Sequence, residues 1–316
     1  MKTRFCQIKS ACNWLAKGVF PLFLLGHIPL LLAKNHWFFE LFSHYLHYYA
    51  LAALFLMLLN AALKRFKTAL ILSLILALHL TQLSPYLEAP NLKKTSTSTT
   101  QTLLSQNVYY LNPNTDEFLT MLDKHHPDFF VIHEAGPLWE NLLPELKNRY
   151  PHVQFGGHHG PTGIIIGSQS PGTFTEIPLG KDLALQFEPA NGQTAILAVH
   201  PLPGMNRKMS ENYHAYYQDL APYLNAHPEK DWIVVGDFNA TPWSPVIKSL
   251  LADTNLQDAR IGFGKFPFFT PTWNAHLPIF KIPIDHALVS PGIQIHNFAR
   301  LESTDSDHWG IWLEFD

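Results

Sequence analysis

The clearest arrangement of residues that could do chemistry lies within Asp231–Pro245. Its apolar, β-branched run Trp232–Val235 predicts a buried strand. Asp237 and Asn239 follow with one residue between them, and alternation along an extended chain places both side chains on the same side. A carboxylate and a carboxamide therefore project together from the end of a core strand, which is a rigid place for chemistry. Both are also ordinary turn formers, so this stretch alone leaves a simple turn open.

Polar groups also stand at the ends of other strand-like stretches. Phe129–Ile132 predicts a buried strand that ends at His133 and Glu134, where a glutamate is costly unless it is solvated, paired or bound to a cation. Thr194–Val199 predicts a strand that delivers His200 at its end. The remaining groups are Asn107 in Leu103–Tyr110, Asp285 near the start of Ile284–Val289, and Asp307 with His308 before Trp309–Phe315.

Each of these groups also has a plain structural interpretation. Asn107 could be a strand-edge amide, Glu134 a helix-capping acid and His200 a satisfied core histidine. Asp285-His286 could be a surface pair and Asp307-His308 a turn. The coincidence of all of them at strand ends favours one shared site.

The elements that must position these groups alternate between strands and helices. Helices are expected over Thr115–Lys124, Leu138–Tyr150, Asn212–Asn225 and Val246–Asp253, and a hairpin over Asp182–Glu188 and Gln193–His200. A Gly-rich turn and a short strand are expected within Phe155–Ile166. The pattern predicts an α/β domain with mixed sheets over residues 103–316.

The charge of the 316-residue chain is divided unevenly. Eight basic and two acidic residues precede residue 91, which leaves 14 basic and 23 acidic residues after it, a basic front of +6 and an acidic remainder of −9. This asymmetry suggests a membrane part and a soluble part. Nucleic-acid binders normally carry a basic face, so tight non-specific DNA binding is not indicated.

Three apolar runs in region 1–90, at 14–33, 45–63 and 68–84, approach the length that a helix needs to cross a bilayer, and we expect about three transmembrane helices. His27 and His79 lie within these runs, where a neutral histidine bonded to a neighbouring helix is the favoured explanation over a functional intramembrane group. A cleaved signal peptide is the alternative for the first run, but two further runs follow it, which favours anchoring.

The basic residues of the front third predict an orientation. They lie before the first run and between the second and third, so the N-terminus is expected in the cytoplasm. Three crossings would put the rest of the chain outside the inner (plasma) membrane, in the periplasm or an equivalent extracytoplasmic space. If the third run does not cross, the domain returns to the cytoplasm. Residues 91–102, rich in Ser and Thr, predict a flexible linker.

The ordered set of motifs resembles the metal-dependent endonuclease/exonuclease/phosphatase superfamily, over about residues 103–316. The motifs that carry the resemblance are Asn107-Val108, Pro127–Glu134, Val199-His200, Gly236–Asn239, Ile284–His286 and Ser306–His308. The sequence departs from the family at His133, where a glutamine is usual; a histidine keeps hydrogen-bonding capacity, so activity is expected to survive. The resemblance implies a four-layer α/β/β/α sandwich of two mixed sheets.

The resemblance also implies hydrolysis of phosphodiester bonds with Mg²⁺ or Mn²⁺, hard cations that prefer oxygen ligands. It implies that Glu134 holds the metal, that Asn107 lies beside it and that Asp307 supports it through water. Asp237 would orient and deprotonate the attacking water, and Asn239 would hold that water or the phosphate. His308, braced by Asp285, would donate to a phosphate oxygen, and His200 would contact the phosphate.

The natural substrate stays open at this stage. A membrane-anchored nuclease-like enzyme is favoured, and a lipid, inositol or sugar phosphate phosphodiesterase is the alternative. The aromatic residues of Phe263–Phe269 with Trp273, and of Tyr213–Tyr217, could stack bases or touch a bilayer, or could lie in the core. A catalytically dead binding module and a transporter are the non-enzyme alternatives, and no protein partner is expected.

Overall fold

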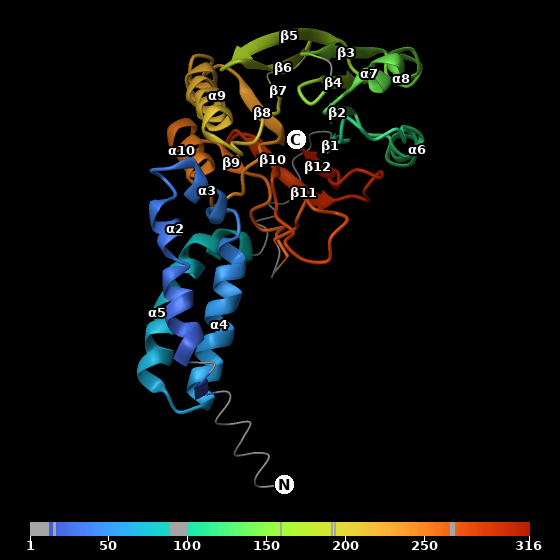
Figure 1. Ribbon diagram of the computed structural model, residues 1–316. Helices are drawn as coiled ribbons and strands as arrows, with labels where there is room; N and C mark the ends of the chain where they lie inside the picture. The colour runs from blue at the N-terminus through green and yellow to red at the C-terminus, as the bar shows by residue number, and fades with distance from the viewer. Residues whose placement is uncertain are drawn as a thin grey trace. The chain divides into compact units, whose positions relative to one another are not determined.

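The computed structural model describes residues 13–14, 17–88, 100–158, 160–190, 192, 194–265 and 269–316. The chain divides into two compact units, Met1–Pro85 and Tyr86–Asp316, drawn as ribbons in Figure 1. Most of the predicted linker, residues 91–99, lies outside the described residues. The first strand already begins at Gln101.

The first unit is helical. Its described elements are α2 (Ile28–Leu32), α3 (Trp37–Ser43), α4 (Leu46–Ala62), α5 (Phe66–Leu83) and the start of the short 3₁₀ helix η1 (Ser84–Leu87). By length and composition, one described helix, Phe66–Leu87, could cross a membrane. A second span is possible if Lys17–Leu32 and Trp37–Ser43, bent by 116°, count as one, while Leu46–Ala62 is shorter. About three transmembrane helices are therefore not confirmed among the described residues.

The two histidines of the apolar runs lie against one another. The Nε2 atoms of His27 and His79 are 3.0 Å apart, and His27 Nδ1 lies 2.7 Å from the carbonyl oxygen of Phe23. The imidazoles stack with centroids 5.2 Å apart. A hydrogen bond between two imidazoles needs one of them to be a neutral acceptor. The pair therefore agrees with the expected neutral histidine that bonds to a neighbouring helix.

The second unit contains two six-stranded mixed sheets. The first has the order β11-β12-β1-β2-β4-β3, in which only β1 and β2 run parallel. Its strands are β1 (Gln101–Asn107), β2 (Phe129–His133), β3 (His152–Gly156), β4 (Ile164–Ser168), β11 (Ile295–Arg300) and β12 (Ile311–Phe315).

The second sheet has the order β5-β6-β7-β8-β10-β9, in which only β7 and β8 run parallel. Its strands are β5 (Gly172–Leu179), β6 (Asp182–Pro189), β7 (Thr194–Val199), β8 (Asp231–Asp237), β9 (Gln257–Asp258) and β10 (Asp285–Val289). Because β10 is antiparallel to β8, β10 begins at the edge where β7 and β8 end.

Three hydrophobic clusters hold the layers together. One cluster lies between the sheets and joins residues such as Val131 of β2 to Val235 of β8. Another packs α6 (Asp116–His125), α7 (Pro137–Asn141) and α8 (Leu143–Arg149) on the outer face of the first sheet. The third packs α9 (Arg207–Asn225) and α10 (Pro245–Thr254) on the outer face of the second.

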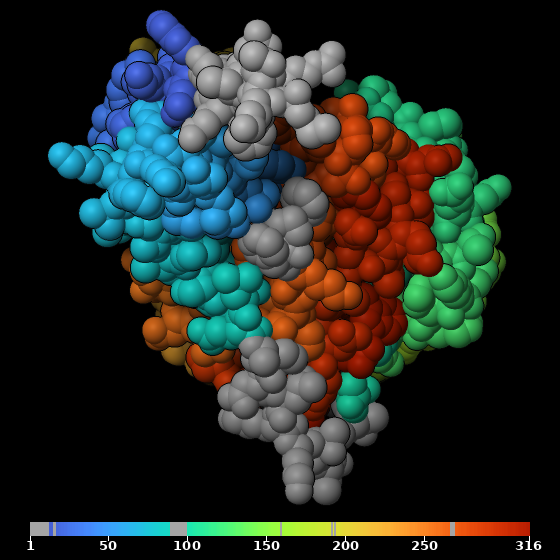
Figure 2. All heavy atoms as spheres, turned by 90° about the horizontal axis from the view of Figure 1, so that it is seen from below, coloured from blue at the N-terminus to red at the C-terminus, as the bar shows by residue number. Residues whose placement is uncertain are grey.

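The two groups of helices lie on opposite sides of the sheets in the ribbon view (Figure 1). In the space-filling view the green region of α6 to α8 borders the red region of β11 and β12, as expected for a sheet and its cover (Figure 2). The predicted α/β fold with two mixed sheets is confirmed, and the clusters arrange it in four layers. Burial of these apolar faces is the main force that stabilises them.

Candidate active site

The predicted site residues lie at one edge of the two sheets. Asn107 ends β1, Glu134 follows β2, His200 follows β7 and Asp237 ends β8. Asp285 begins β10 and is paired in register with Asp237. His308 lies between β11 and β12, on the loop that leads into β12. The structure thus brings together groups that are up to about 200 residues apart, as parallel strand ends and antiparallel strand starts require.

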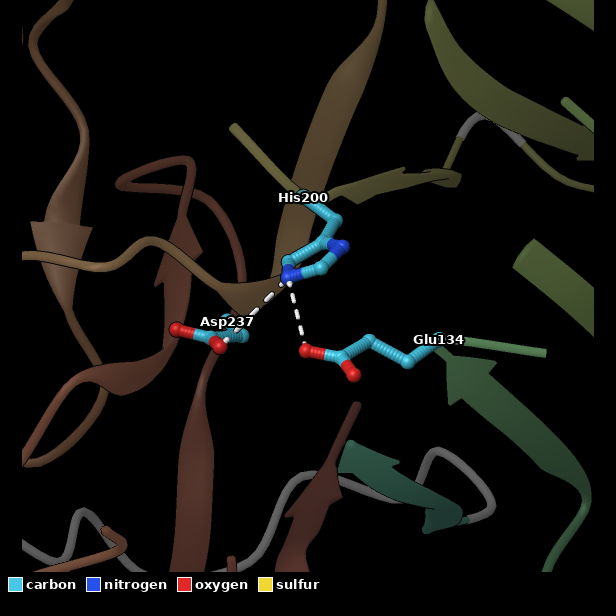
Figure 3. Close-up of side chains that lie close together, drawn as sticks. All are labelled: Glu134, His200 and Asp237. Carbon is cyan, nitrogen blue, oxygen red and sulfur yellow. Dashed lines mark ion pairs between the residues drawn. The ribbon is translucent and has the colours of Figure 1, made fainter. Parts of the chain in front are cut away.

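Glu134, His200 and Asp237 form the centre of the site (Figure 3). His200 Nε2 lies 3.7 Å from Glu134 Oε1 and 3.5 Å from Asp237 Oδ2. The His200 imidazole is buried, and neither of its nitrogens has a hydrogen-bond partner among the described residues. His200 is therefore not the satisfied core histidine that the sequence left open.

Asn107 links two carboxylates that belong to different sheets. Its Nδ2 donates to Glu134 Oε1 at 2.9 Å and to Asp237 Oδ2 at 3.0 Å. Its Oδ1 accepts from the backbone N–H of Tyr109 at 2.9 Å, which fixes the orientation of the amide. Asn107 therefore holds the two carboxylates close together in this structure, and its service as a metal ligand stays a prediction.

Asp285 and His308 form a second cluster. His308 Nδ1 donates to Asp285 Oδ2 at 2.9 Å, and His308 Nε2 lies 3.6 Å from Asp237 Oδ2. The backbone N–H of Asp285 donates to Thr272 Oγ1 at 2.9 Å, and the N–H of His308 donates to Ser306 Oγ at 3.0 Å. These bonds orient the His308 ring so that Nε2 points toward Asp237, the arrangement expected of a braced imidazole.

Asp237 is the hub of the site. Nitrogen atoms of four side chains lie within 3.6 Å of its Oδ2, and they belong to Asn107, His200, Asn239 and His308. Its Oδ1 accepts from the backbone N–H of Asn239 at 2.8 Å. Asn239 adopts a left-handed backbone with φ of 49°, which turns the chain and brings its amide back beside Asp237.

The close packing of charges perturbs the pKa values of the site. Burial by itself lowers the pKa of His308, but the carboxylates of Asp285 and Asp237 outweigh it and raise that pKa to about 10. Burial opposes ionisation of Asp237, yet His308 and His200 hold its pKa well below the ordinary value. The pKa of His200 is raised in spite of burial, through Asp237 and Glu134. At neutral pH an imidazolium therefore faces an ionised carboxylate.

Asp307 lies beside the centre of the site. Its carboxylate accepts from Trp273 Nε1 at 3.0 Å. It does not belong to the groups of carboxylate and imidazole atoms that lie within 4.8 Å of one another in the described part of the chain. Its support of a metal through water stays a prediction.

His133 does not make the hydrogen bonds that its place in the motif led us to expect. Its ring is fully buried, and neither nitrogen has a hydrogen-bond partner in the described part of the chain. Burial lowers its pKa to about 3, so it is neutral. The ring lies against Gly236, where an added Cβ would come within 2.5 Å of His133 Nε2. Its present role is therefore packing between the two sheets.

The donor set fits a divalent cation. Glu134 with His200 and Asp237, and Asp237 with Asp285 and His308, each place one donor atom per residue within 4.8 Å of the others. Glu134 is only partly buried, with 16% of its side chain exposed, so one face of this cluster is open. Two carboxylates held this close together repel one another unless a positive charge lies between or beside them. The oxygen donors of Glu134 and Asp237 suit a hard cation.

A buried network behind β10 was not predicted from the sequence. Arg260 donates from Nη1 to Asp258 Oδ2 at 3.3 Å and from Nη2 to the carbonyl oxygen of Asp285. Its Nη1 also lies 2.9 Å from His286 Nδ1, and His286 Nε2 lies 2.7 Å from the carbonyl oxygen of Ala240. Asp285 and His286 are both buried, so the surface pair that the sequence left open is wrong. The Asp-x-Arg spacing at 258–260 could have indicated this network, because it puts both side chains on the same side of an extended chain.

The sequence as a whole matches one family. The model of the Endonuclease/Exonuclease/phosphatase family matches residues 104–308, which is more than half of the chain, and the chain belongs to this family. No curated protein matches the sequence of this chain.

Solved structures with similar folds agree with this assignment. They include the 3′ phosphatase NExo from Neisseria bound to product DNA hairpin, with 17% identity over 68% of this chain and 99% of that chain and a TM-score of 0.58. An AP endonuclease from Archaeoglobus fulgidus has 13% identity over 68% and 99% of the two chains, with a TM-score of 0.58. TDP2 from D. rerio, complexed with single strand DNA product, has 18% identity over 69% and 100%, with a TM-score of 0.56. At these identities the similarity shows the fold.

Membership of this family makes the chain a hydrolase that acts on phosphate esters. The dead binding module and the transporter are therefore set aside. The retained carboxylates and imidazoles of the site agree with an active enzyme.

Proposed function

We propose that the protein is a divalent-metal-dependent phosphodiesterase, tethered to a membrane by its N-terminal apolar helices. The observation that carries the proposal is the convergence of four side-chain nitrogens on Asp237 Oδ2, with Glu134 beside it. Such a cluster can orient a water molecule and neutralise a phosphoryl group in one place. Mg²⁺ is the first candidate for the metal and Mn²⁺ the second, because the carboxylate oxygens suit both.

Each residue of the site has its own role in hydrolysis. Asp237 is ionised, so it orients the attacking water and takes its proton while the water oxygen bonds to phosphorus. Asn239 holds the water or the phosphate from the other side of Asp237. A metal held at Glu134 would supply positive charge to the phosphoryl oxygens. The bond between phosphorus and the leaving oxygen breaks, and that oxygen takes up a proton from water, which balances the proton that Asp237 accepted and gives the alcohol.

The two histidines of the site act on the phosphate. His308 carries a proton at neutral pH, and its Nε2–H is free of Asp285, so it donates to a phosphoryl oxygen. His200 has no internal hydrogen-bond acceptor among the described residues, and a phosphate oxygen would supply one. Both contacts strengthen as negative charge develops, which is the requirement for catalysis.

The test uses the full chain in detergent micelles with methyl 4-nitrophenyl phosphate, a small soluble phosphodiester. We expect release of 4-nitrophenol with Mg²⁺ or Mn²⁺, loss of the reaction with EDTA, and recovery when the metal is restored. Metal-independent hydrolysis, or none with either ion, would overturn the proposal.

Nucleic acid is the first natural substrate to examine. Two of the similar structures, NExo and TDP2, are complexes with DNA products. Single-stranded and duplex oligonucleotides therefore belong in the first assays, with release of fragments or of terminal phosphate as the measurement. The acidic balance of −9 after residue 90 predicts weak binding to nucleic acid.

The proposed location is the inner membrane, with the catalytic domain on the extracytoplasmic side. The basic residues of the front third support a cytoplasmic N-terminus. An odd number of crossings then exports the domain, whereas two crossings would leave it in the cytoplasm. A C-terminal alkaline phosphatase fusion, which is active only after export, should be active. A silent fusion together with a fluorescent C-terminal GFP fusion would contradict the proposed location.

A further inference from the structure

The exposed apolar residues of the second unit are concentrated around its site. Ten large apolar side chains of this unit are exposed among the described residues, and eight of them lie on four segments: 109–114, 137–141, 201–206 and 274–280. The other two are Leu87 and Ile261. We call these eight side chains the apolar rim; they are Tyr109, Tyr110, Leu111, Leu138, Met205, Leu277, Ile279 and Phe280. Scattered exposed apolar residues are ordinary on a protein surface, but their concentration at one place marks an interaction surface.

The fold places all four segments at the catalytic edge of the sheets. The first three follow β1, β2 and β7, and the fourth leads into β10, so each leaves from the edge where the site residues stand. Hydrogen bonds join three of them to the site. The backbone N–H of Tyr110 donates to Glu134 Oε2 at 3.1 Å, Asn239 Nδ2 donates to the carbonyl oxygen of Pro201 at 3.1 Å, and the N–H of Ala275 donates to the carbonyl oxygen of Asp307 at 2.9 Å.

The exposure of the rim is large for apolar side chains. Leu111 is 60% exposed, Met205 59% and Ile279 54%. In the fourth segment five successive residues, 276–280, are exposed. The aromatic stretches singled out in the sequence behave differently. Tyr213, Tyr216 and Phe269 are buried, and residues 266–268 lie outside the described residues.

The composition of the rim segments argues against binding of a nucleic-acid backbone. The four segments together contain no lysine or arginine, and the basic residues that directly follow two of them are Arg207, Lys208 and Lys281. Proteins that bind nucleic acid neutralise its phosphates with such residues, and single strands need a basic groove beside their stacking aromatics. Apolar side chains around a phosphate-ester site suit a substrate whose phosphate is attached to hydrocarbon.

We infer that the apolar rim receives the hydrocarbon part of a phospholipid, so that the substrate is a lipid phosphodiester presented by a bilayer or micelle. This inference rests on the proposed phosphodiesterase function, and names its substrate class. Apolar rim residues enter the acyl region at the interface, and the phosphodiester lies at the level of the headgroups, where Asp237 and His308 reach it. Hydrolysis adds water across one P–O ester bond and leaves a phosphomonoester and an alcohol.

The test compares long-chain and short-chain forms of the same phosphodiester with the full chain in detergent. The lipids are phosphatidylglycerol, phosphatidylethanolamine and phosphatidylcholine in mixed micelles, each with its dibutanoyl form below the critical micelle concentration. Methyl 4-nitrophenyl phosphate and a single-stranded oligonucleotide complete the set. We expect at least one long-chain lipid to be cleaved with a kcat/KM roughly tenfold or more above that of its short-chain form, because apolar burial adds to its binding.

The variant Leu111→Ser/Leu277→Ser/Ile279→Ser removes three rim side chains that are each at least half exposed. It should lower the ratio of long-chain to short-chain kcat/KM roughly tenfold or more. Ile261→Ser, at an exposed apolar residue outside the rim, is the matched control and should leave the ratio as it is. Circular dichroism of each variant checks that it folds.

The outcomes separate this inference from the function on which it rests. If the wild type cleaves no phosphodiester at all, the proposed function fails. If it cleaves methyl 4-nitrophenyl phosphate but no lipid, or shows no preference for long chains, only the lipid inference fails. An unchanged ratio in the triple variant also overturns it, as does a loss confined to the oligonucleotide, which would assign the rim to nucleic acid.

Discussion

His308, on the loop that leads into β12 of the first sheet, donates a 2.9 Å hydrogen bond to Asp285, the first residue of β10 in the second sheet. The bond crosses between the sheets at the catalytic edge, as does the bond from Asn107 to Asp237 at 3.0 Å. The site therefore depends on the docking of one sheet against the other. The residues that form the catalytic site therefore also hold the two sheets together.

The His308–Asp285 pair predicts a pH dependence of stability. The pKa of His308 is about 10 in the folded protein, against the 6.5 of an ordinary histidine, so the pair's stabilisation is complete below pH 6.5 and is lost as the pH rises through 10. In EDTA, the urea midpoint of the wild type should fall over this range. His308→Gln should have a lower midpoint at pH 6.5 and a flatter profile. Parallel profiles for the two proteins would contradict the ion pair.

Glu134→Gln tests the predicted metal site. The substitution keeps the size of the side chain and removes one negative charge from the partly exposed face of the cluster. We expect the Mg²⁺ concentration for half-maximal activity to rise roughly tenfold or more, because carboxylate charge sets the affinity for hard cations. Glu117→Gln, at an exposed position in the first turn of α6, is the matched control. An unchanged metal requirement in Glu134→Gln would place the cation elsewhere.

Arg260→Met tests the buried network behind β10. The substitution leaves Asp258 buried without its cation, which should lower the free energy of unfolding by about 3–5 kcal/mol. The double variant Asp258→Leu/Arg260→Met removes both charges and should recover much of the loss. Urea denaturation followed by tryptophan fluorescence measures both. Equal instability of the single and double variants would mean that packing, rather than charge, is the main contribution of Arg260.

Gly236→Ala tests the close approach of the two sheets. An added Cβ would lie 2.1 Å from the carbonyl oxygen of Val199 and 2.5 Å from His133 Nε2, and the backbone φ of 150° disfavours a side chain. We expect a loss of roughly 1–3 kcal/mol or more from overpacking. Gly192→Ala, whose Cβ would meet nothing closer than 3.7 Å, should be tolerated. Comparable melting temperatures for the two variants would contradict this packing.

The sequence predicted the centre of the fold better than its edges. The core strands that deliver Glu134, His200 and Asp237 have continuous apolar runs, and they were predicted within a residue or two. The strands β3, β5, β9 and β11 were not predicted, and all four are edge strands of the two sheets. Edge strands bury one face or less, as the alternating exposure of β5 shows, so their apolar signal is weak.

The residues of the site could be predicted from their positions at strand ends, but the contacts between their side chains could not. The amide orientation of Asn107, and the position of Asp307 against Trp273, depend on side-chain contacts between distant segments. Arg260 was overlooked because arginine is almost never fully buried, so the Asp-x-Arg spacing alone was too weak a signal. The apolar rim was missed for the opposite reason: its leucines and isoleucine resemble core residues until the fold leaves them exposed.

The role of Asp237 as the base is measured by metal-dependent hydrolysis of methyl 4-nitrophenyl phosphate with the wild type and with Asp237→Asn. Asp253→Asn, at an exposed position on α10, is the control. The wild type and the control should turn over only with Mg²⁺ or Mn²⁺, and Asp237→Asn should lose roughly 10²–10⁴-fold in kcat while it remains folded. Near-normal, metal-dependent turnover in a folded Asp237→Asn protein would contradict it.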